Sequence, residues 1–141
     1  MLFYCRNYLK IVALNSKMSK EYVSKYIEFT EKGIVQVKTT TIHSDDLGPT
    51  ECVIQNDASI ISAGTVLATL YNLNSTISYP IVPGYGSIGR IIEKGSGLKD
   101  FNIGDRVFFA GKHASTQGFN HEGTHQWVYL FPVPEGLDPV E

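Results

Sequence analysis

The sequence predicts a mainly β fold with short helices, and three features support this prediction. β-branched and aromatic residues form short runs, such as residues 34–42 (IVQVKTTTI), a composition typical of strands. Glycines and prolines separate these runs as turns would, most densely in residues 79–109. A chain of 141 residues is long enough for one hydrophobic core and short for two. We therefore expect a single, mainly β domain.

The first seventeen residues differ from the rest of the chain. Residues 1–17 are rich in apolar and aromatic side chains and contain three basic residues but no acidic one. Their uncharged apolar runs are too short for a membrane span or for the core of a signal peptide. We interpret 1–17 as an N-terminal extension and 18–141 as the folded domain.

Strand signals follow one another through the remainder of the chain. Residues 26–29 and 34–42 flank a turn and predict a hairpin. A third strand is predicted from residue 51 to residue 61, and a last one at 126–130. Residues 63–70 (AGTVLATL) are predicted to form the one short helix, and 111–123 a polar loop.

Residues 79–109 read YPIVPGYGSIGRIIEKGSGLKDFNIGDRVFF and predict two strands joined by a long loop. Two prolines three residues apart favour extended backbone at the start, so no helix is expected to begin there. The isoleucines on either side of Arg90 predict a strand that ends at the glycines of 95–97. Leu98 and Phe101 are the apolar anchors of the loop that leads to the next strand.

The pattern of residues in this segment resembles the substrate-domain core of the medium-chain dehydrogenase/reductase family. These are the alcohol dehydrogenase-like proteins with a GroES-like β-barrel. The shared pattern includes spaced glycines, Glu93, Phe101 and the run Gly104–Val107, and a weaker resemblance covers about residues 25–141. It implies a GroES-like, partly open β-barrel that acts as the family's N-terminal substrate domain. Residues 61–65 and 84–86 are most similar to zinc-free members, including proteins like bacteriochlorophyllide dehydrogenase.

The resemblance also places the residues of the active site. Zinc members carry a cysteine in one turn and a G-H-E sequence in another, and the metal polarises the substrate oxygen. Here Ala63, or Ser62 if the alignment shifts by one, stands at the cysteine position, and Tyr85 and Gly86 replace the histidine and the glutamate. We therefore expect no zinc and expect these four residues to line the substrate pocket. Thr65 falls at the proton-relay hydroxyl, although it could equally be a helix N-cap.

Two short motifs suggest other functions. Residues 84–89 spell G-x-G-x-x-G, which binds a dinucleotide only between a strand and the start of a helix. No helix is predicted after 84–89, so we expect no cofactor-binding residue within this chain. Residues 121–125 spell H-E-x-x-H, which on a helix binds zinc in hydrolases, but a glycine stands in its middle. A metal hydrolase, or a fortuitous metal site of His113, His121 and His125, is kept as an alternative.

The composition of the sequence indicates which partners and which cellular compartment to expect. A net charge of -2 without a basic run argues against a nucleic-acid partner. Two cysteines suit a reducing compartment, so a cytoplasmic location is expected, and Cys52 is interpreted as a small core residue. In the run after Gly104, Asp105 is expected to cap backbone N–H groups of a turn and Arg106 to lie on the barrel surface.

The function implied by the resemblance is that of the substrate-binding domain of a zinc-independent, medium-chain NAD(P)-dependent oxidoreductase. In that family NAD(P) lies between this domain and a nucleotide-binding Rossmann domain, which we expect to be missing here because the chain is truncated before it. The isolated chain is therefore expected to be inactive. Its partners would be a small-molecule substrate, a separate or downstream Rossmann domain and, in a homodimer, a second copy, with no membrane partner. The alternative is a stand-alone GroES-like barrel that binds a ligand or partner without catalysis.

Overall fold

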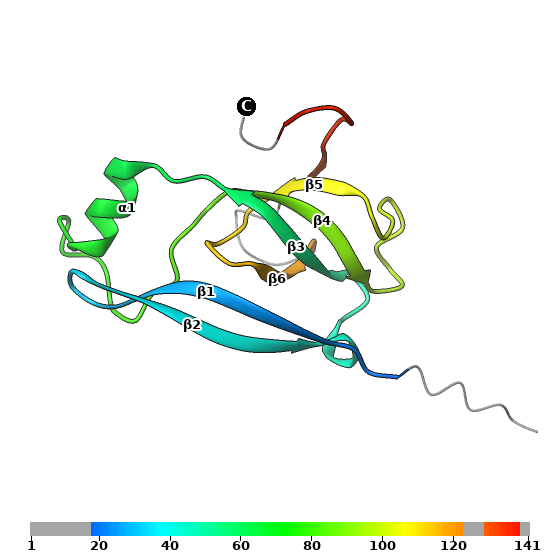
Figure 1. Ribbon diagram of the computed structural model, residues 1–141, viewed down its shortest axis with the longest axis horizontal. Coiled ribbons are helices and arrows are strands. Elements are labelled where there is room, and N and C mark those ends of the chain that lie inside the picture. The colour runs from blue at the N-terminus through cyan, green and yellow to red at the C-terminus, as the bar shows by residue number, and fades with distance from the viewer. Residues whose placement is uncertain (1–17, 123–128, 139–141) are drawn as a thin grey trace, which may run out of the picture.

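The structure is a computed structural model that describes residues 18–122 and 129–138 (Figure 1). Its strands form two antiparallel sheets, one of β1 and β2 and one in the order β6-β3-β4-β5-β7. The mainly β fold with short helices is therefore confirmed. The elements are β1 (Glu21–Glu31), β2 (Ile34–His43), η1 (Ser44–Asp46), β3 (Glu51–Ser59), α1 (Ala63–Leu70), β4 (Ser87–Lys94), β5 (Arg106–Phe109), β6 (Thr116–Asn120) and β7 (Leu130–Pro132).

The predicted hairpin is confirmed as β1 and β2. It turns at Gly33, whose φ of 76° lies in the left-handed region that glycine adopts without strain. The other edge of β1 bonds to loops of the larger sheet, with N–H···O distances of 2.9 Å from Ile27 to His113 and 2.8 Å from Phe29 to Ile81. The hairpin thus lies across from the five-stranded sheet and is joined to it along one edge (Figure 1). This arrangement is the partly open barrel that the sequence predicted.

The hydrophobic core lies on one face of the five-stranded sheet. Side chains alternate between the two faces of a strand, and along β4 and β5 every second residue is buried. The predicted loop anchors Leu98 and Phe101 are 3% and 7% exposed and complete this core. Its buried members are Cys52, Ile54, Ile91, Leu98, Phe101, Val107, Phe109 and Leu130.

Gly89 allows β3 and β4 to approach each other closely. A Cβ atom on Gly89 would lie only 2.2 Å from the carbonyl oxygen of Gln55 on the neighbouring strand. Gly89 pairs with Asn56 inside β4, which continues to Lys94. Because a strand follows residues 84–89, the G-x-G-x-x-G string lacks the helix start that binds a pyrophosphate. The prediction that no helix begins after 84–89 is confirmed.

The predicted polar loop at 111–123 is partly wrong, because Thr116–Asn120 forms the edge strand β6. The sequence of β6, TQGFN, contains few strongly strand-forming residues. It pairs antiparallel with β3, Thr116 is 8% exposed, and Phe119 packs edge-to-face on Phe109 with 5.5 Å between ring centroids. Contacts with the rest of the fold, rather than local propensity, select the strand.

The helix α1 spans the residues predicted for it, 63–70. Its N-cap position is occupied by Ser62 and Thr65 is its third residue, so the N-cap interpretation of Thr65 is wrong. The predicted last strand at 126–130 lies mostly outside the described residues, and β7 is placed at Leu130–Pro132. Among the described residues, no helix has the length and apolar character needed to cross a membrane.

Candidate functional site

The first group of predicted pocket residues lies where β3 leads into α1. Ser62 is the N-cap residue of α1, Ala63 is its first residue, and Thr65 follows in the first turn of the helix. The hydroxyl oxygens of Ser62 and Thr65 are 3.2 Å apart, within hydrogen-bond distance. Thr65 is exposed and also lines a hollow of about 330 Å³ beside α1. Thr65 is therefore accessible from outside, and its hydroxyl has a polar neighbour within hydrogen-bond distance.

The second group, Tyr85 and Gly86, lies in the loop before β4. The N–H of Ile60 donates to the carbonyl oxygen of Gly86 at 2.9 Å, which joins this loop to the segment leading to Ser62. Gly86 is buried, and a Cβ there would lie 3.0 Å from Ile60 Cδ1 and 3.3 Å from the ring of Phe108. Tyr85 is 44% exposed. The two predicted groups are thus held together through Ile60 and Gly86, with the Tyr85 ring at the surface.

An aromatic platform that the sequence analysis missed lies beside Tyr85. It consists of Phe108, Tyr129 and Phe131. The ring of Tyr129 stacks on Phe108 with 5.7 Å between centroids and on Phe131 with 5.8 Å. The Tyr129 hydroxyl donates to the carbonyl oxygen of Tyr85 at 2.7 Å. Strand alternation could have revealed Phe108, because its neighbours on both sides belong to the core and it must therefore face the other way.

A second missed feature is a polar pair next to the same loop. Ser59 Oγ, at the end of β3, lies 2.8 Å from His113 Nδ1. The backbone N–H of His113 donates to Pro83 in the segment that leads to Tyr85. Burial lowers the pKa of His113 and so favours the neutral imidazole. The sequence analysis had considered His113 only as a metal ligand and had not considered Ser59.

The side chains at the predicted zinc positions do not fit a metal ion. Ala63 and Gly86 have no donor atoms, and Tyr85 alone cannot form a tetrahedral site. Among the described residues there is no cluster of three or more His, Cys, Asp or Glu side chains that could hold an ion. Of the H-E-x-x-H motif, His121 packs edge-on against Phe101 with 5.9 Å between centroids. Glu122 belongs to the described range, where its backbone N–H donates to Asn120 Oδ1 at 3.0 Å, and residues 123–125 of the motif lie outside it.

The prediction for Asp105 is confirmed by the structure, whereas the prediction for Arg106 is wrong. Asp105 Oδ2 accepts the backbone N–H of Asn102 at 2.7 Å, which confirms its predicted role in the turn. Arg106 is not a surface residue, because its side chain is only 13% exposed. Its Nε lies 3.5 Å from Asp57 Oδ2, and its Nη1 donates to the carbonyl oxygen of Leu137. The guanidinium therefore fixes the segment after β7 against β3, a role that a local sequence pattern does not reveal.

Comparison with known protein families identifies this fold. Residues 31–131 match the model of the alcohol dehydrogenase GroES-like domain. The chain belongs to this family. The predicted relationship to the medium-chain dehydrogenases/reductases is therefore confirmed, together with the GroES-like fold. No curated protein matches the sequence.

Solved structures similar to this GroES-like domain include several oxidoreductases. A mutant enoyl thioester reductase from Candida tropicalis has a TM-score of 0.64 and 16% identity, over 80% of this chain and 34% of that one. A quinone oxidoreductase from Pseudomonas syringae has a TM-score of 0.62 and 16% identity, over 82% and 35%. CAD from Helicobacter pylori, complexed with NADP(H), has a TM-score of 0.58 and 16% identity, over 77% and 44%. The GroES-like domain thus spans less than half the length of these proteins, and identities this low establish a shared fold.

Proposed function

We propose that residues 18–141 are the substrate-binding domain of a zinc-independent, medium-chain NAD(P)-dependent oxidoreductase. The domain would form one wall of a cleft, and a nucleotide-binding domain would form the other. It would act on a small-molecule substrate in the cytoplasm. The main support is the placement of Ser62 and Ala63 near the Tyr85–Gly86 loop, with an aromatic platform next to that loop of which Phe131 is exposed.

The residues of this wall have separate roles in the proposed mechanism. Bound nicotinamide would supply or accept a hydride. Tyr85 and the apolar side chains near it would hold the substrate and exclude water, because Tyr85 and Ile61 are 44% and 71% exposed and have surface to bury. Thr65 would hold or pass on the proton that accompanies the hydride, with Ser62 as its neighbour at 3.2 Å.

Zinc independence is proposed from the chemistry of the side chains. In zinc members the metal stabilises charge on the substrate oxygen. Here hydrogen bonds from Thr65 and from the Tyr85 hydroxyl would have to do so. Measurement of the metal content of the purified protein tests this point, since zinc at one equivalent per chain would overturn it.

The cofactor is proposed to bind mainly to the other domain. The only G-x-G-x-x-G string of the sequence, at 84–89, precedes the strand β4 and cannot present a helix start to a pyrophosphate. We expect the isolated chain to leave NADPH fluorescence unchanged at micromolar protein concentrations. Saturable binding with a micromolar Kd would show that the phosphate-binding site lies within this chain.

The decisive experiment combines this chain with the nucleotide-binding domain encoded in the same or a neighbouring reading frame. NADPH oxidation would be assayed with a quinone and with an enoyl thioester, the substrate classes named for two of the similar structures. Replacement of Thr65 by Ala is expected to lower kcat by about 10²–10⁴-fold, the usual contribution of a general acid. Thr65→Ser should restore most of the activity, and Thr39→Ala on the exposed side of β2 should leave it unchanged.

A stand-alone binding module is the second candidate, because the surface near the wall is unusually apolar. Ile61 and Phe131 are 71% and 57% exposed, and such side chains often mark a contact surface. This candidate predicts that the chain binds a ligand or a partner but supports no NADPH oxidation with any nucleotide-binding domain supplied. Activity that is lost in Thr65→Ala and restored in Thr65→Ser would exclude it.

A further inference from the structure

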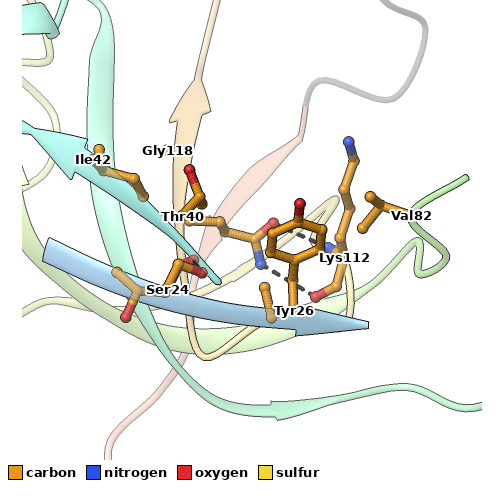
Figure 2. A pocket seen from close by; sticks show the side chains of 10 residues that line it. Ser24, Tyr26, Thr40, Ile42, Val82, Lys112 and Gly118 are labelled. Carbon is orange, nitrogen blue, oxygen red and sulfur yellow. Dashed lines mark hydrogen bonds between the residues drawn. The ribbon is translucent and has the colours of Figure 1, made fainter. Parts of the chain in front are cut away.

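A pocket of about 250 Å³ lies between the β1–β2 hairpin and the segment that contains β6 (Figure 2). None of the residues proposed to bind the oxidoreductase substrate lines it. The hairpin supplies one side and the chain from residue 112 to residue 118 supplies the other. The lining residues are Ser24, Tyr26, Thr40, Ile42, Val82, Lys112, Ala114, Thr116, Gln117 and Gly118.

One end of this pocket carries two hydrogen-bond donors, on Lys112 and Tyr26. Lys112 is the only charged residue of the lining. Among the described residues, no carboxylate lies within ion-pair distance of its ammonium, and the Tyr26 hydroxyl has no hydrogen-bond partner. Figure 2 shows the Lys112 ammonium and the Tyr26 hydroxyl pointing in the same direction, with Val82 beside Lys112. This end of the pocket is therefore suited to a group that accepts hydrogen bonds and carries a negative charge.

Apolar side chains line the pocket from Val82, beside Lys112, to Ile42 at the other end (Figure 2). Ile42, Val82 and Ala114 present only hydrocarbon side chains, and Gly118 leaves open space, since a Cβ atom there would meet nothing within 4 Å. The Ser24 hydroxyl is already used, because it donates to the carbonyl oxygen of Thr116. A ligand would gain here by burying an alkyl or similar apolar group.

The walls of the pocket are fixed by hydrogen bonds around Lys112. Its backbone N–H donates to Gln117 Oε1 at 3.0 Å, and Gln117 Nε2 donates back to its carbonyl oxygen at 3.3 Å, as the dashed lines of Figure 2 show. Asn56 Nδ2 donates to the carbonyl oxygen of Ala114 at 2.7 Å. A pocket formed in advance loses little conformational entropy when it binds a ligand.

We propose that this pocket binds a small amphipathic carboxylate. The carboxylate would accept hydrogen bonds from Lys112 and Tyr26, and its alkyl chain would lie against Ile42, Val82 and Ala114. The volume is below the range of about 300–1,000 Å³ that is usual for ligand sites, which favours a short-chain acid over a long one.

The proposal is tested first by titrating the whole chain with hexanoate, using the neutral 1-hexanol as the matched probe, and by following amide chemical shifts. Hexanoate is expected to shift the amides of the pocket residues, above all Tyr26, Lys112 and Ala114, and to bind at least tenfold more tightly than hexanol. From butyrate to hexanoate, each added methylene should improve the affinity about fourfold while apolar surface is still being buried. Equal affinity for hexanol, absence of saturable binding, or shifts confined to another part of the chain would overturn the proposal.

Three variants test the contribution of the Lys112 charge to binding separately from that of the pocket volume. Lys112→Gln should weaken hexanoate binding at least tenfold and leave hexanol binding unchanged, whereas Lys99→Gln, at an exposed lysine outside the pocket, should change neither. A Cβ atom at Gly118 would meet nothing within 4 Å, so we expect Gly118→Leu to occupy the pocket and abolish binding of both probes while the amide spectrum stays that of a folded protein. Undiminished hexanoate binding in Lys112→Gln, or in a folded Gly118→Leu variant, would contradict the proposal.

Discussion

Ser59 Oγ and His113 Nδ1 lie 2.8 Å apart and connect the end of β3 to the chain that follows β5. The other ring nitrogen of His113, Nε2, is buried and has no hydrogen-bond partner among the described residues. Protonation of the ring would place an N–H group and a positive charge in this site without an acceptor. Burial of this site therefore favours the neutral imidazole over the protonated one.

We predict that His113 makes the protein less stable in mild acid. Burial lowers the pKa of His113 in the folded state below its value of 6.5. As the pH falls below 6.5, the unfolded chain binds this proton first, so the free energy of unfolding decreases until the folded-state pKa has been passed. Urea unfolding of the wild type should give a lower midpoint at pH 5.5 than at pH 7.5, and His113→Gln should reduce this difference.

The control for this prediction is His43→Gln. The side chain of His43 is 43% exposed and lies at the end of β2, so its replacement should leave the His113 contribution to the acid destabilisation in place. If His113→Gln and the wild type lose the same stability between the two pH values, the histidine is not the source of the effect.

The sequence predicted those parts of the fold whose signals are local. The turn residue Gly33 and the β-branched residues on both sides of it were enough to predict the hairpin. Both ends of α1 were predicted correctly. The strand β6 was missed because its polar sequence becomes a strand only by pairing with β3. Arg106 was misplaced for the same reason, since its partners Asp57 and Leu137 are distant in sequence.

The candidate site was predicted to a similar extent. The resemblance to the family pointed to Ala63 and Tyr85, but their role as a substrate wall stays a prediction. The aromatic platform depends on stacking between Phe108 and Tyr129, which come together only when β5 and β7 pair. The Ser59–His113 pair likewise joins residues 54 positions apart. Long-range contacts of this kind leave no periodic signal in a single sequence.

Replacement of Gly89 by Ala is predicted to disrupt the five-stranded sheet. The new methyl group would lie 2.2 Å from the carbonyl oxygen of Gln55 and 2.9 Å from the Cα of Asn56, both of which are backbone atoms. Relief of this clash requires β3 and β4 to separate, so we expect a loss of about 3 kcal/mol or more, at the upper end of the usual cost of overpacking. Urea unfolding followed by circular dichroism measures it. Gly118→Ala on β6 is the matched control and should change stability by less than about 0.5 kcal/mol.

Glu93→Gln is predicted to loosen the start of the hairpin from β4. Glu93 is 3% exposed, and its Oε2 accepts hydrogen bonds from Lys20 Nζ at 2.9 Å and from the Tyr22 hydroxyl at 3.1 Å. A hydrogen bond to a charged group contributes about 1.5–3 kcal/mol, so the neutral amide should lower the free energy of unfolding by about 2 kcal/mol. Lys20→Gln should have a much smaller effect, because its ammonium is exposed to solvent. A Glu93→Gln variant as stable as the wild type would show that the charge is unimportant here.

Cys52 is predicted to be unreactive until the protein unfolds. Its side chain is fully buried in the core, and burial raises the pKa of the Cys52 thiol to about 12. At pH 8 only about one molecule in ten thousand would carry the reactive thiolate, and the reagent would also lack access. In a Cys5→Ser variant, which leaves Cys52 as the single thiol, a disulfide reagent should therefore react only at the rate at which the fold opens.

Urea distinguishes a Cys52 thiol that is protected by burial from an accessible thiol that reacts slowly. In the Cys5→Ser variant, the amount of reacted thiol should rise along the same urea curve as the loss of circular dichroism, because unfolding exposes the side chain and restores an ordinary pKa. The Cys52→Ser variant should lack this urea-dependent component. Rapid reaction of the Cys5→Ser protein in buffer alone, with a rate that follows pH as for a free thiol, would contradict the core position of Cys52 on β3.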